Sequence, residues 1–246
     1  MFHHAHTELS LIINFLLKHI WNHFGHLLET LEQPWLSNEN LQSMCNAVKE
    51  KGAPLTNSWG FIDGTVRPMC RPQLHQRAVY NGHKRVHALK FQSIVAANGL
   101  IANLFGPVEG RRHDAFLLSE SKVLSKMESK LDENGNPFCI YGDPAYPLRR
   151  QLICPFKGSR LTQQEQLFNK RMSTNRIAVE WVFGKLLQNF AFVDFKKNLK
   201  MLLQPVAMYF KVAAIFTNCH TCIYGSNTST YFNLSPPDIE DYLMER

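Results

Sequence analysis

The chain has 246 residues, 45% of them hydrophobic, and carries a formal net charge of +7 with a pI near 9.1. This predicts one large folded domain, or a domain with an appendage, and favours polyanionic partners. Six scattered cysteines argue against a disulfide framework, and the apolar window of residues 9–17 is too short to span a bilayer, so neither secretion nor membrane insertion is expected.

The first 57 residues are expected to form a helical appendage. Apolar residues recur every three or four positions over residues 9–31, which predicts a helix with one buried face. A second helix is expected from Ser37 or Asn38 through Val48, ending at Gly52.

Extended structure is expected from Trp59 onwards. A short apolar run is predicted to end as a strand at Asp63, and two further runs cover residues 87–97 and 100–105. The dipeptide Asn98-Gly99 between these two runs is the strongest short-range hairpin signal, so they are predicted to pair antiparallel.

A helix, two short strands and a long helix are expected next. The first helix begins at His113-Asp114 and runs to Leu131, and residues 138–141 and 152–156 follow as strands. Thr162 and Glu165 then form a capping box that opens a helix continuing through Glu180 to about Leu187.

A last apolar helix is predicted over residues 199–223, before a polar tail at 225–246 that lies packed on, or loose from, the body. The order of elements predicts an α/β fold with a mixed sheet flanked by helices over residues 58–224.

Three acids lie in settings that suit one metal site. Asp63 in Gly-Phe-Ile-Asp-Gly-Thr and Asp143 in Tyr-Gly-Asp-Pro-Ala-Tyr-Pro each follow an apolar run, and Glu180 lies in a helical pattern one turn after Arg176. Carboxylates are the ligands that Mg²⁺ and Mn²⁺ prefer, and a pair of such ions supports phosphodiester cleavage. The acids are therefore predicted to be both metal ligands and catalytic residues.

Each acid also has a simpler interpretation. Asp63-Gly64 is a common turn dipeptide, Asp143 before Pro144 starts turns and helices, and Glu180 could be a surface partner of Arg176. Only the combination of the three acids is specific for a metal site.

Residues 65–108 contain no Asp or Glu and carry several cations, which predicts contacts with a nucleic-acid backbone; a solvated basic loop is the alternative. These cations are Arg67, Arg71, Arg77, Lys84, Arg85 and Lys90. Cys219-His220-Thr221-Cys222 resembles half a zinc site, but small buried cysteines on the last helix are the favoured interpretation.

Several motifs together resemble the DDE superfamily endonucleases, specifically the PIF/Harbinger transposases and the nucleases domesticated from them. The resemblance runs from about residue 59 to 192, and its motifs are Gly-Phe-Ile-Asp-Gly-Thr at 60–65, Tyr-Asn-Gly-His-Lys at 80–84, Gly-Arg-Arg-His-Asp at 110–114, Tyr-Gly-Asp-Pro-Ala-Tyr-Pro at 141–147, Phe-Asn at 168–169 and Arg-Ile-Ala-Val-Glu-Trp-Val-Phe-Gly at 176–184.

The resemblance implies an RNase H-like sheet on which Asp63, Asp143 and Glu180 form a metal-binding triad. Asp114 is the rival for the second place, because the His-Asp pair is also typical of the family; Asp143 is preferred because it follows a strand, whereas N-capping explains Asp114.

Two departures argue against autonomous transposition. Related transposases often carry Lys or Arg seven residues after the glutamate, where this chain has Leu187, with Lys185 as a substitute. They also begin with a longer helix-turn-helix region, whereas the first 58 residues here supply about two helices.

The resulting hypothesis is a nuclear, Mg²⁺- or Mn²⁺-dependent DNA endonuclease, with the cytoplasm as a second compartment. Arg67, Lys84, Arg85 and Arg176 are expected to hold the DNA backbone. A separate DNA-binding partner protein and a homo-oligomer are further expectations. The rival hypotheses are an inactive transposase-derived DNA- or protein-binding module and an unrelated phosphatase or RNase H-type enzyme.

Overall fold

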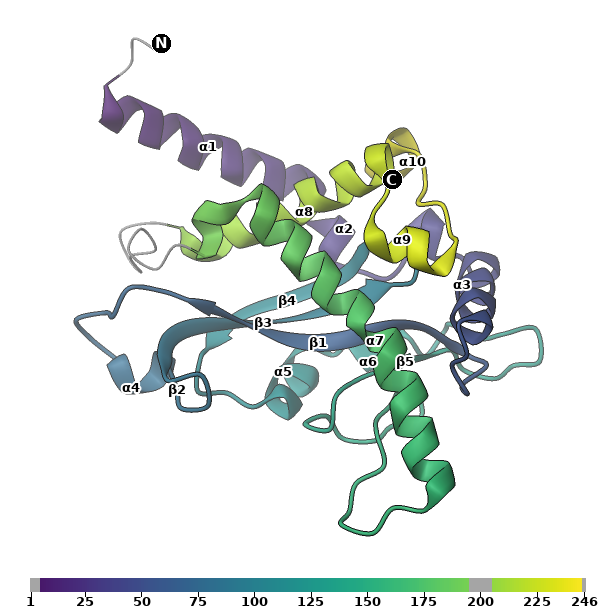
Figure 1. Cartoon of the computed structure of the whole chain (residues 1–246). Coiled ribbons are helices and arrows are strands. Elements are labelled where there is room, and N and C mark those ends of the chain that lie inside the picture. The colour runs from purple at the N-terminus through teal and green to yellow at the C-terminus, as the bar shows by residue number, and fades with distance from the viewer. Residues whose placement is uncertain (1–4, 195–204, 245–246) are drawn as a thin grey trace.

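The computed structural model describes residues 5–194 and 205–244 as a mixed sheet flanked by helices (Figure 1). The sheet has the order β2-β3-β1-β5-β6, with β4 also paired to β3. Pairing is antiparallel between β1 and β3 and between β3 and β4, and parallel between β1 and β5 and between β5 and β6. The strands are β1 Ser58–Pro68, β2 Tyr80–Asn81, β3 Val86–Ala96, β4 Ile101–Glu109, β5 Cys139–Tyr141 and β6 Leu152–Ile153. The predicted α/β class is confirmed.

Helices cover both faces of this sheet. In Figure 1, α7 and α8 lie on one face and α5 on the other. The helices are α1 His6–Phe24, α2 His26–Glu29, α3 Asn38–Glu50, α4 Gln76–Val79, α5 Asp114–Ser121, α6 Val123–Lys126, α7 Gln163–Asn189, α8 Val206–Tyr224, α9 Asn227–Phe232 and α10 Ile239–Leu243, and the 3₁₀ turns are η1 Pro34–Leu36 and η2 Ala191–Asp194.

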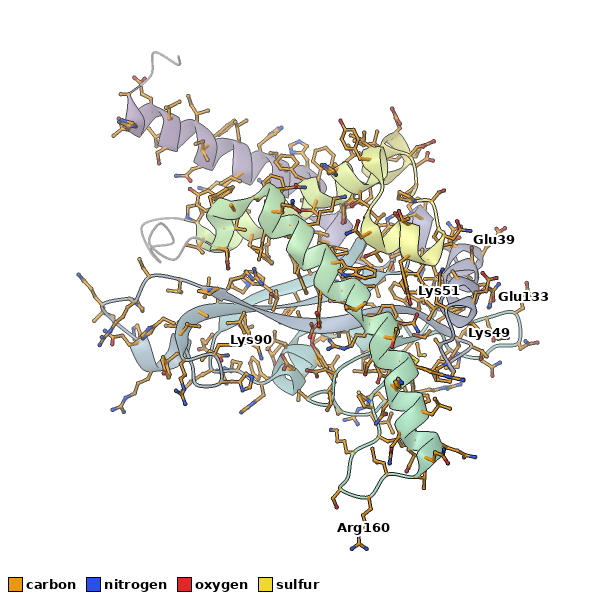
Figure 2. The ribbon with its side chains drawn as sticks, in the orientation of Figure 1. Glu39, Lys49, Lys51, Lys90, Glu133 and Arg160 are labelled. Carbon is orange, nitrogen blue, oxygen red and sulfur yellow. The ribbon has the colours of Figure 1, made fainter. Side chains whose placement is uncertain are left out.

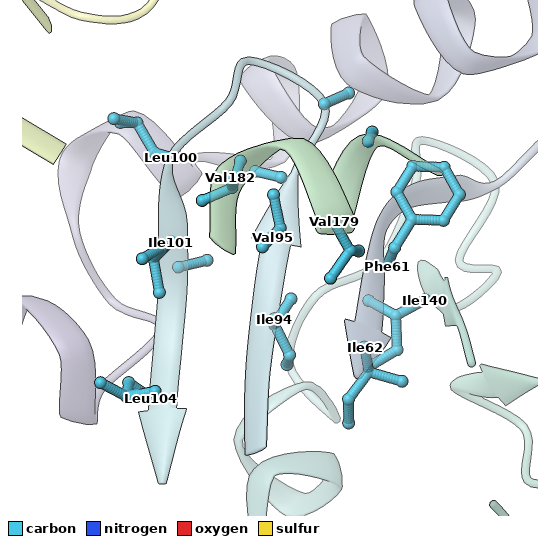
Figure 3. Close-up of a cluster of buried hydrophobic side chains, with 14 of the residues drawn as sticks. Phe61, Ile62, Ile94, Val95, Leu100, Ile101, Leu104, Ile140, Val179 and Val182 are labelled. Carbon is cyan, nitrogen blue, oxygen red and sulfur yellow. The ribbon is translucent and has the colours of Figure 1, made fainter. Parts of the chain in front are cut away.

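The core lies between the three long strands and α7. Figure 3 shows aliphatic side chains of α7 above those of the sheet. Each fully buried side chain of this kind contributes about 1.5–3 kcal/mol to stability relative to exposure. The labelled residues are Phe61, Ile62, Ile94, Val95, Leu100, Ile101, Leu104, Ile140, Val179 and Val182, all of them buried.

The predicted hairpin is confirmed, but β1 is longer than expected. Gly99 has φ +87°, which suits glycine at the turn between β3 and β4. Asp63 was predicted to end a strand, yet it lies in the middle of β1, opposite Ser93. The strand continues to Pro68 because residues 64–68 pair with residues 88–92 of β3.

Two predicted helices are interrupted. The helix expected over residues 9–31 is divided at Gly25 into α1 and α2. The helix expected from His113 to Leu131 is divided at Lys122, whose φ of +50° is incompatible with a continuous α-helix. By contrast, the capping box that opens α7 is confirmed: the Glu165 backbone N–H donates to Thr162 Oγ1 and the Thr162 N–H donates to Glu165 Oε2.

Both end segments contribute to the core. Leu28 of α2 and Leu41 of α3 belong to the same buried cluster as the strands, and so do Phe232 and Tyr242 near the end of the chain. The polar tail therefore packs on the body. The predicted domain boundaries at 57 and 224 stay a prediction.

Helix α8 is apolar because it is a core helix. By length and hydropathy Val206–Tyr224 could cross a membrane, but half of that window is buried inside the protein. Residues 199–204 of the helix predicted there lie outside the described residues.

Helix α1 departs from the expectation of a buried face. No α1 side chain is buried among the described residues, and Leu11 and Phe15 are 70% and 69% exposed. Within the described residues, this helix packs mainly against α8.

Replacing Phe15 with Ala is therefore expected to change the free energy of unfolding by less than about 0.5 kcal/mol, because little apolar area is lost. Denaturant unfolding measures this change. The buried Phe138, exchanged in the same way, is the matched control and should cost about 3–5 kcal/mol. A large loss for Phe15→Ala would mean that another surface covers α1.

Candidate active site

Asp63 lies at the centre of the sheet on the face covered by α7. Side chains alternate along a strand, so Phe61, Asp63 and Thr65 point to the same face. The Asp63 side chain is only 22% exposed. Its Oδ1 accepts a hydrogen bond from the Gly64 backbone N–H at 2.9 Å, and its Oδ2 lies 3.4 Å from Nη1 of Arg176.

Arg176 joins two of the three predicted acids. It precedes Glu180 by one turn of α7, and its Nη2 lies 3.9 Å from Glu180 Oε1. Because the same guanidinium contacts Asp63, the fold brings Asp63 and Glu180 to one place. The Glu180 side chain is 62% exposed, so it can change rotamer without disturbing the core.

Asp143 lies just after the neighbouring strand, β5. It follows β5 by two residues, and β5 pairs with β1 in parallel through Phe61 and Tyr141. The Asp143 Oδ1 accepts from the Ala145 backbone N–H at 2.8 Å, which fixes the turn after the strand. The fold therefore places Asp143 beside Asp63, as expected for successive positions along neighbouring parallel strands.

The carboxyl of Asp63 has an unusual acidity. Burial raises its pKa from the ordinary 3.8 to about 6. Arg176 and the Gly64 N–H lower the pKa, and the negative charges of Asp143 and Asp114 raise it. Burial therefore outweighs the contact with Arg176 in setting the pKa of this carboxyl.

Asp114 lies on the opposite face of β1. It is the first residue of α5, and its Oδ1 accepts from Lys90 Nζ at 2.8 Å. Figure 2 shows Lys90 on the sheet near α5, and its Nζ also donates to the Arg112 carbonyl at 3.1 Å. The Asp114 carboxylate thus has a buried cation of its own, which favours Asp143 over this rival.

Gly64 leaves the space that Asp114 occupies. A Cβ at residue 64 would lie 2.2 Å from Asp114 Oδ1. In the sequence, Asp63-Gly64 indicates only a common turn dipeptide, and the contact of Gly64 with Asp114 depends on the fold.

Replacing Gly64 with Ala is expected to destabilise the protein by roughly 1–3 kcal/mol, because the Asp114 carboxylate must move and weaken its bond to Lys90. Thermal unfolding measures the loss. Gly184→Ala is the matched control: no described residue lies within 4 Å of a Cβ there, and alanine favours the α7 helix by up to about 1 kcal/mol. Equal effects at both glycines would contradict this account.

Tyr146 is a further residue of the site. Its side chain is buried, and burial raises its pKa well above the ordinary value, with Asp114, Asp63 and Asp143 adding to the rise. Its hydroxyl has no hydrogen-bond partner within residues 5–194 and 205–244. The residue belongs to the motif around Asp143, yet nothing in the pattern distinguished it from a core tyrosine.

The chemistry of these residues suits a divalent ion, but their present positions do not. The donors are oxygens, one carboxyl has a raised pKa, and a buried hydroxyl nearby lacks a partner. However, no three His, Cys, Asp or Glu side chains in the described part of the chain converge closely enough to hold an ion. Asp63 and Glu180 instead face the guanidinium of Arg176.

Arg67 lies away from solvent, which differs from its predicted contact with DNA. Its side chain is 11% exposed, and its Nη1 lies 3.6 Å from Asp194 Oδ1. Its guanidinium donates to Thr65 Oγ1 and lies 5.4 Å from the Phe210 ring centroid. Burial lowers the pKa of this guanidinium. Strand alternation directs Arg67 under α8, so a phosphate cannot approach it in this conformation.

Lys84 and Arg85 are exposed in the turn before β3, at a distance from Asp63. Arg85 precedes Ser93, the partner of Asp63, by eight residues, which is about 26 Å at roughly 3.3 Å per residue. Lys185 is used internally, because its Nζ donates to Thr221 Oγ1 at 3.1 Å and to the Gly225 carbonyl at 2.6 Å.

Comparison with known proteins identifies one family. The family model described as DDE superfamily endonuclease matches residues 62–218, more than half of the chain. The matched range contains Asp63, Asp114, Asp143 and Glu180. No curated protein and no solved structure gives a significant match.

Proposed function

The chain belongs to the DDE superfamily endonucleases, a membership that implies DNA as the substrate, and from this premise we propose that it is a divalent-metal-dependent DNA nuclease of the PIF/Harbinger type. The observations that support this most are the family match over residues 62–218 and the buried carboxyl of Asp63, which contacts Arg176. Such a buried carboxylate beside Asp143 favours an additional cation.

Asp63, Asp143 and Glu180 are the residues that would hold Mg²⁺ or Mn²⁺. When bound, such ions activate the attacking oxygen and stabilise the leaving oxygen of a phosphodiester. Glu180 is exposed and can turn towards Asp63 once Arg176 withdraws. Arg176 is then available to a phosphate, for which its planar guanidinium is suited. The Tyr146 hydroxyl keeps its proton at neutral pH and can donate a hydrogen bond to an oxygen in the site.

The surface turn that carries Lys84 and Arg85 would contact the same DNA at a distance. About 26 Å along β3 corresponds to roughly seven or eight base pairs, at 3.4 Å per pair. A separate DNA-binding protein would supply target recognition, and the nucleus is the compartment proposed for this activity. Lys84→Ala with Arg85→Ala would weaken DNA binding and lower its salt dependence without altering metal binding.

A plasmid-nicking assay tests the function. Supercoiled DNA is incubated with the protein and Mg²⁺ or Mn²⁺ at several salt concentrations, beside Glu180→Gln. We expect nicking by the unchanged protein and a loss of roughly a hundredfold or more in the variant. Glu133→Gln is the matched control, because Glu133 is exposed in the loop before β5 (Figure 2) and should nick normally. Equal nicking by Glu180→Gln would contradict the assignment, and a preference for RNA–DNA hybrids would indicate an RNase H-type enzyme.

A second candidate is a binding module without catalysis. The contacts of Arg176 with both Asp63 and Glu180 favour it, because they give each of these acids a cationic partner without a metal. Calorimetric titration with Mn²⁺ separates the two candidates: absence of binding at millimolar metal supports the binding module, and saturable binding that Asp63→Asn removes supports the nuclease.

A further inference from the structure

A cleft of 640 Å³ opens on the side of α7 that carries Glu180. It lies between α7, the end of α8 and α9, and its other walls include Gly184, His220, Tyr224 and Asn227. Asp63 and Asp143 do not line it, so the cleft adjoins the acids rather than containing them. The nuclease proposed above gives this space no role.

The lining of the cleft is polar but nearly uncharged. Within the described residues it contains one acid, Glu180, and one lysine, Lys185, whose amine already donates to Thr221 and Gly225. This balance disfavours a phosphate group, which selects clusters of cations. Neutral donors and acceptors make up most of the remaining polar lining: Gln188, Asn189, Ser226, Asn227, Thr228 and Thr230.

Aromatic rings offer a surface for stacking. Tyr224 is 74% exposed at the end of α8, and its ring centroid lies 4.8 Å from that of His220. Trp181 contributes a third ring from α7. Exposed aromatic rings beside neutral hydrogen-bonding groups are the chemistry that recognises a nucleobase.

His220 carries an unsatisfied polar atom at this place. Its Nδ1 is buried and has no hydrogen-bond partner in the described ranges. The residue belongs to the Cys-His-Thr-Cys motif, in which the two cysteines are half-buried on α8. His220 lines the cleft, and in the described part of the chain it belongs to no group of side chains that could hold a metal. Across from it, Gly184 leaves the α7 wall open, since no described atom lies within 4 Å of a Cβ there.

We propose that this cleft takes one unpaired nucleobase of the DNA bound at the acids, stacked on the exposed ring of Tyr224, with the His220 ring, tilted by 53°, against the edge of the tyrosine. The inference rests on the proposed function, because Glu180 places the cleft next to the scissile strand. A base enters such a pocket only from a bulge, a flap or a distorted pair, so the protein favours DNA that is locally unpaired.

Fluorescence anisotropy without divalent metal tests the proposal. The full chain is titrated into three labelled duplexes: fully paired, with a one-nucleotide bulge, and with an abasic residue in the bulge. We expect the bulged base to improve affinity about tenfold over the abasic bulge, the size of one stacking contact. Tyr224→Ala with His220→Ala should remove this preference and leave the paired duplex unaffected.

Two matched variants show whether a loss of the preference results from misfolding. Ile223→Ala removes an exposed side chain that does not line the cleft, and Tyr224→Phe keeps the ring; both should retain the preference. A bulge carrying 2-aminopurine should lose fluorescence on binding to the unchanged protein, but not on binding to the double variant. Equal affinity for the base and abasic bulges, or an equal loss in Ile223→Ala, overturns the proposal.

The result of the binding assay is independent of the nicking assay. Divalent metal is removed by a chelator, so the DNA stays uncleaved throughout the titration. If nicking occurs without a base preference, the cleft proposal alone is wrong. If the preference occurs without nicking, the cleft proposal holds and the catalytic one fails.

Discussion

Asp63→Asn is expected to abolish metal-dependent nicking, by roughly a thousandfold or more, while stabilising the metal-free protein at neutral pH. The two effects have one cause. In the proposed function the carboxylate at the centre of β1 binds a cation, and without that cation it is costly to bury.

The pH dependence follows from the raised pKa. The Asp63 carboxyl has a pKa of about 6 in the folded protein and an ordinary value of 3.8. Between pH 4 and 6 the folded state therefore binds more protons than the unfolded state, and stability falls as pH rises. The full fall is about 3 kcal/mol and is complete above pH 6. Asparagine carries no charge, so we expect a gain of about 1–3 kcal/mol at pH 7, with Arg176 left facing Glu180.

Denaturant unfolding of metal-free protein at several pH values from 4 to 7.5 measures this difference. The unchanged protein should lose stability between pH 4 and 6 relative to Asp63→Asn. Asp132→Asn is a control of opposite sign: hydrogen bonds, first that from the Asn136 backbone N–H, lower the pKa of Asp132, so its replacement should be less stable at neutral pH. Mn²⁺ should raise the melting temperatures of the unchanged protein and of Asp132→Asn, but not that of Asp63→Asn. A lower stability of Asp63→Asn at pH 7 would contradict the assignment.

Phe232→Ala should destabilise the protein by about 3–5 kcal/mol, a large part of the 5–15 kcal/mol typical of a domain. Phe232 is 1% exposed in α9, and its ring centroid lies 6.0 Å from that of Phe61. Phe61 precedes Asp63 by two residues on the same face of β1. Removing the Phe232 ring therefore also weakens the packing of β1, the strand that carries Asp63.

The same segment contacts α7 close to Glu180. The Thr228 hydroxyl donates to the Ala178 carbonyl at 3.1 Å, and Tyr231 packs edge-on against Trp181 with centroids 5.4 Å apart. We expect nicking by Phe232→Ala to fall even at temperatures where the variant stays folded. Circular dichroism melting and the plasmid assay check both effects, and Met244→Ala, at an exposed position, should be neutral. An unchanged melting temperature for Phe232→Ala would show that α9 does not support the core.

Local signals in the sequence predicted much of the fold. The hairpin at Gly99 and the capping box at Thr162 each depend on a few adjacent residues, and both are confirmed. The length of β1 does not depend on a few adjacent residues in this way. The residues after Asp63 are held in the strand by pairing with β3, and no local apolar pattern marks that pairing.

The site was predictable only in outline. The helical spacing of Arg176 and Glu180 was visible in the sequence, but the contact between Arg176 and Asp63 depends on how α7 crosses β1. Arg67 appeared as a surface cation because charge is visible in sequence and burial is not. The sequence does not indicate the cleft, because α9, which closes one side of it, is far along the chain from α7.

The contacts of α9 with α7 decide how shortened or tagged versions of this protein should be made. The family match stops at residue 218, so a fragment cut to that limit would omit the Thr228 hydroxyl and its bond to Ala178. Such a fragment should be recovered in inclusion bodies. An affinity tag belongs ahead of α1, which buries no side chain among the described residues and tolerates an added segment.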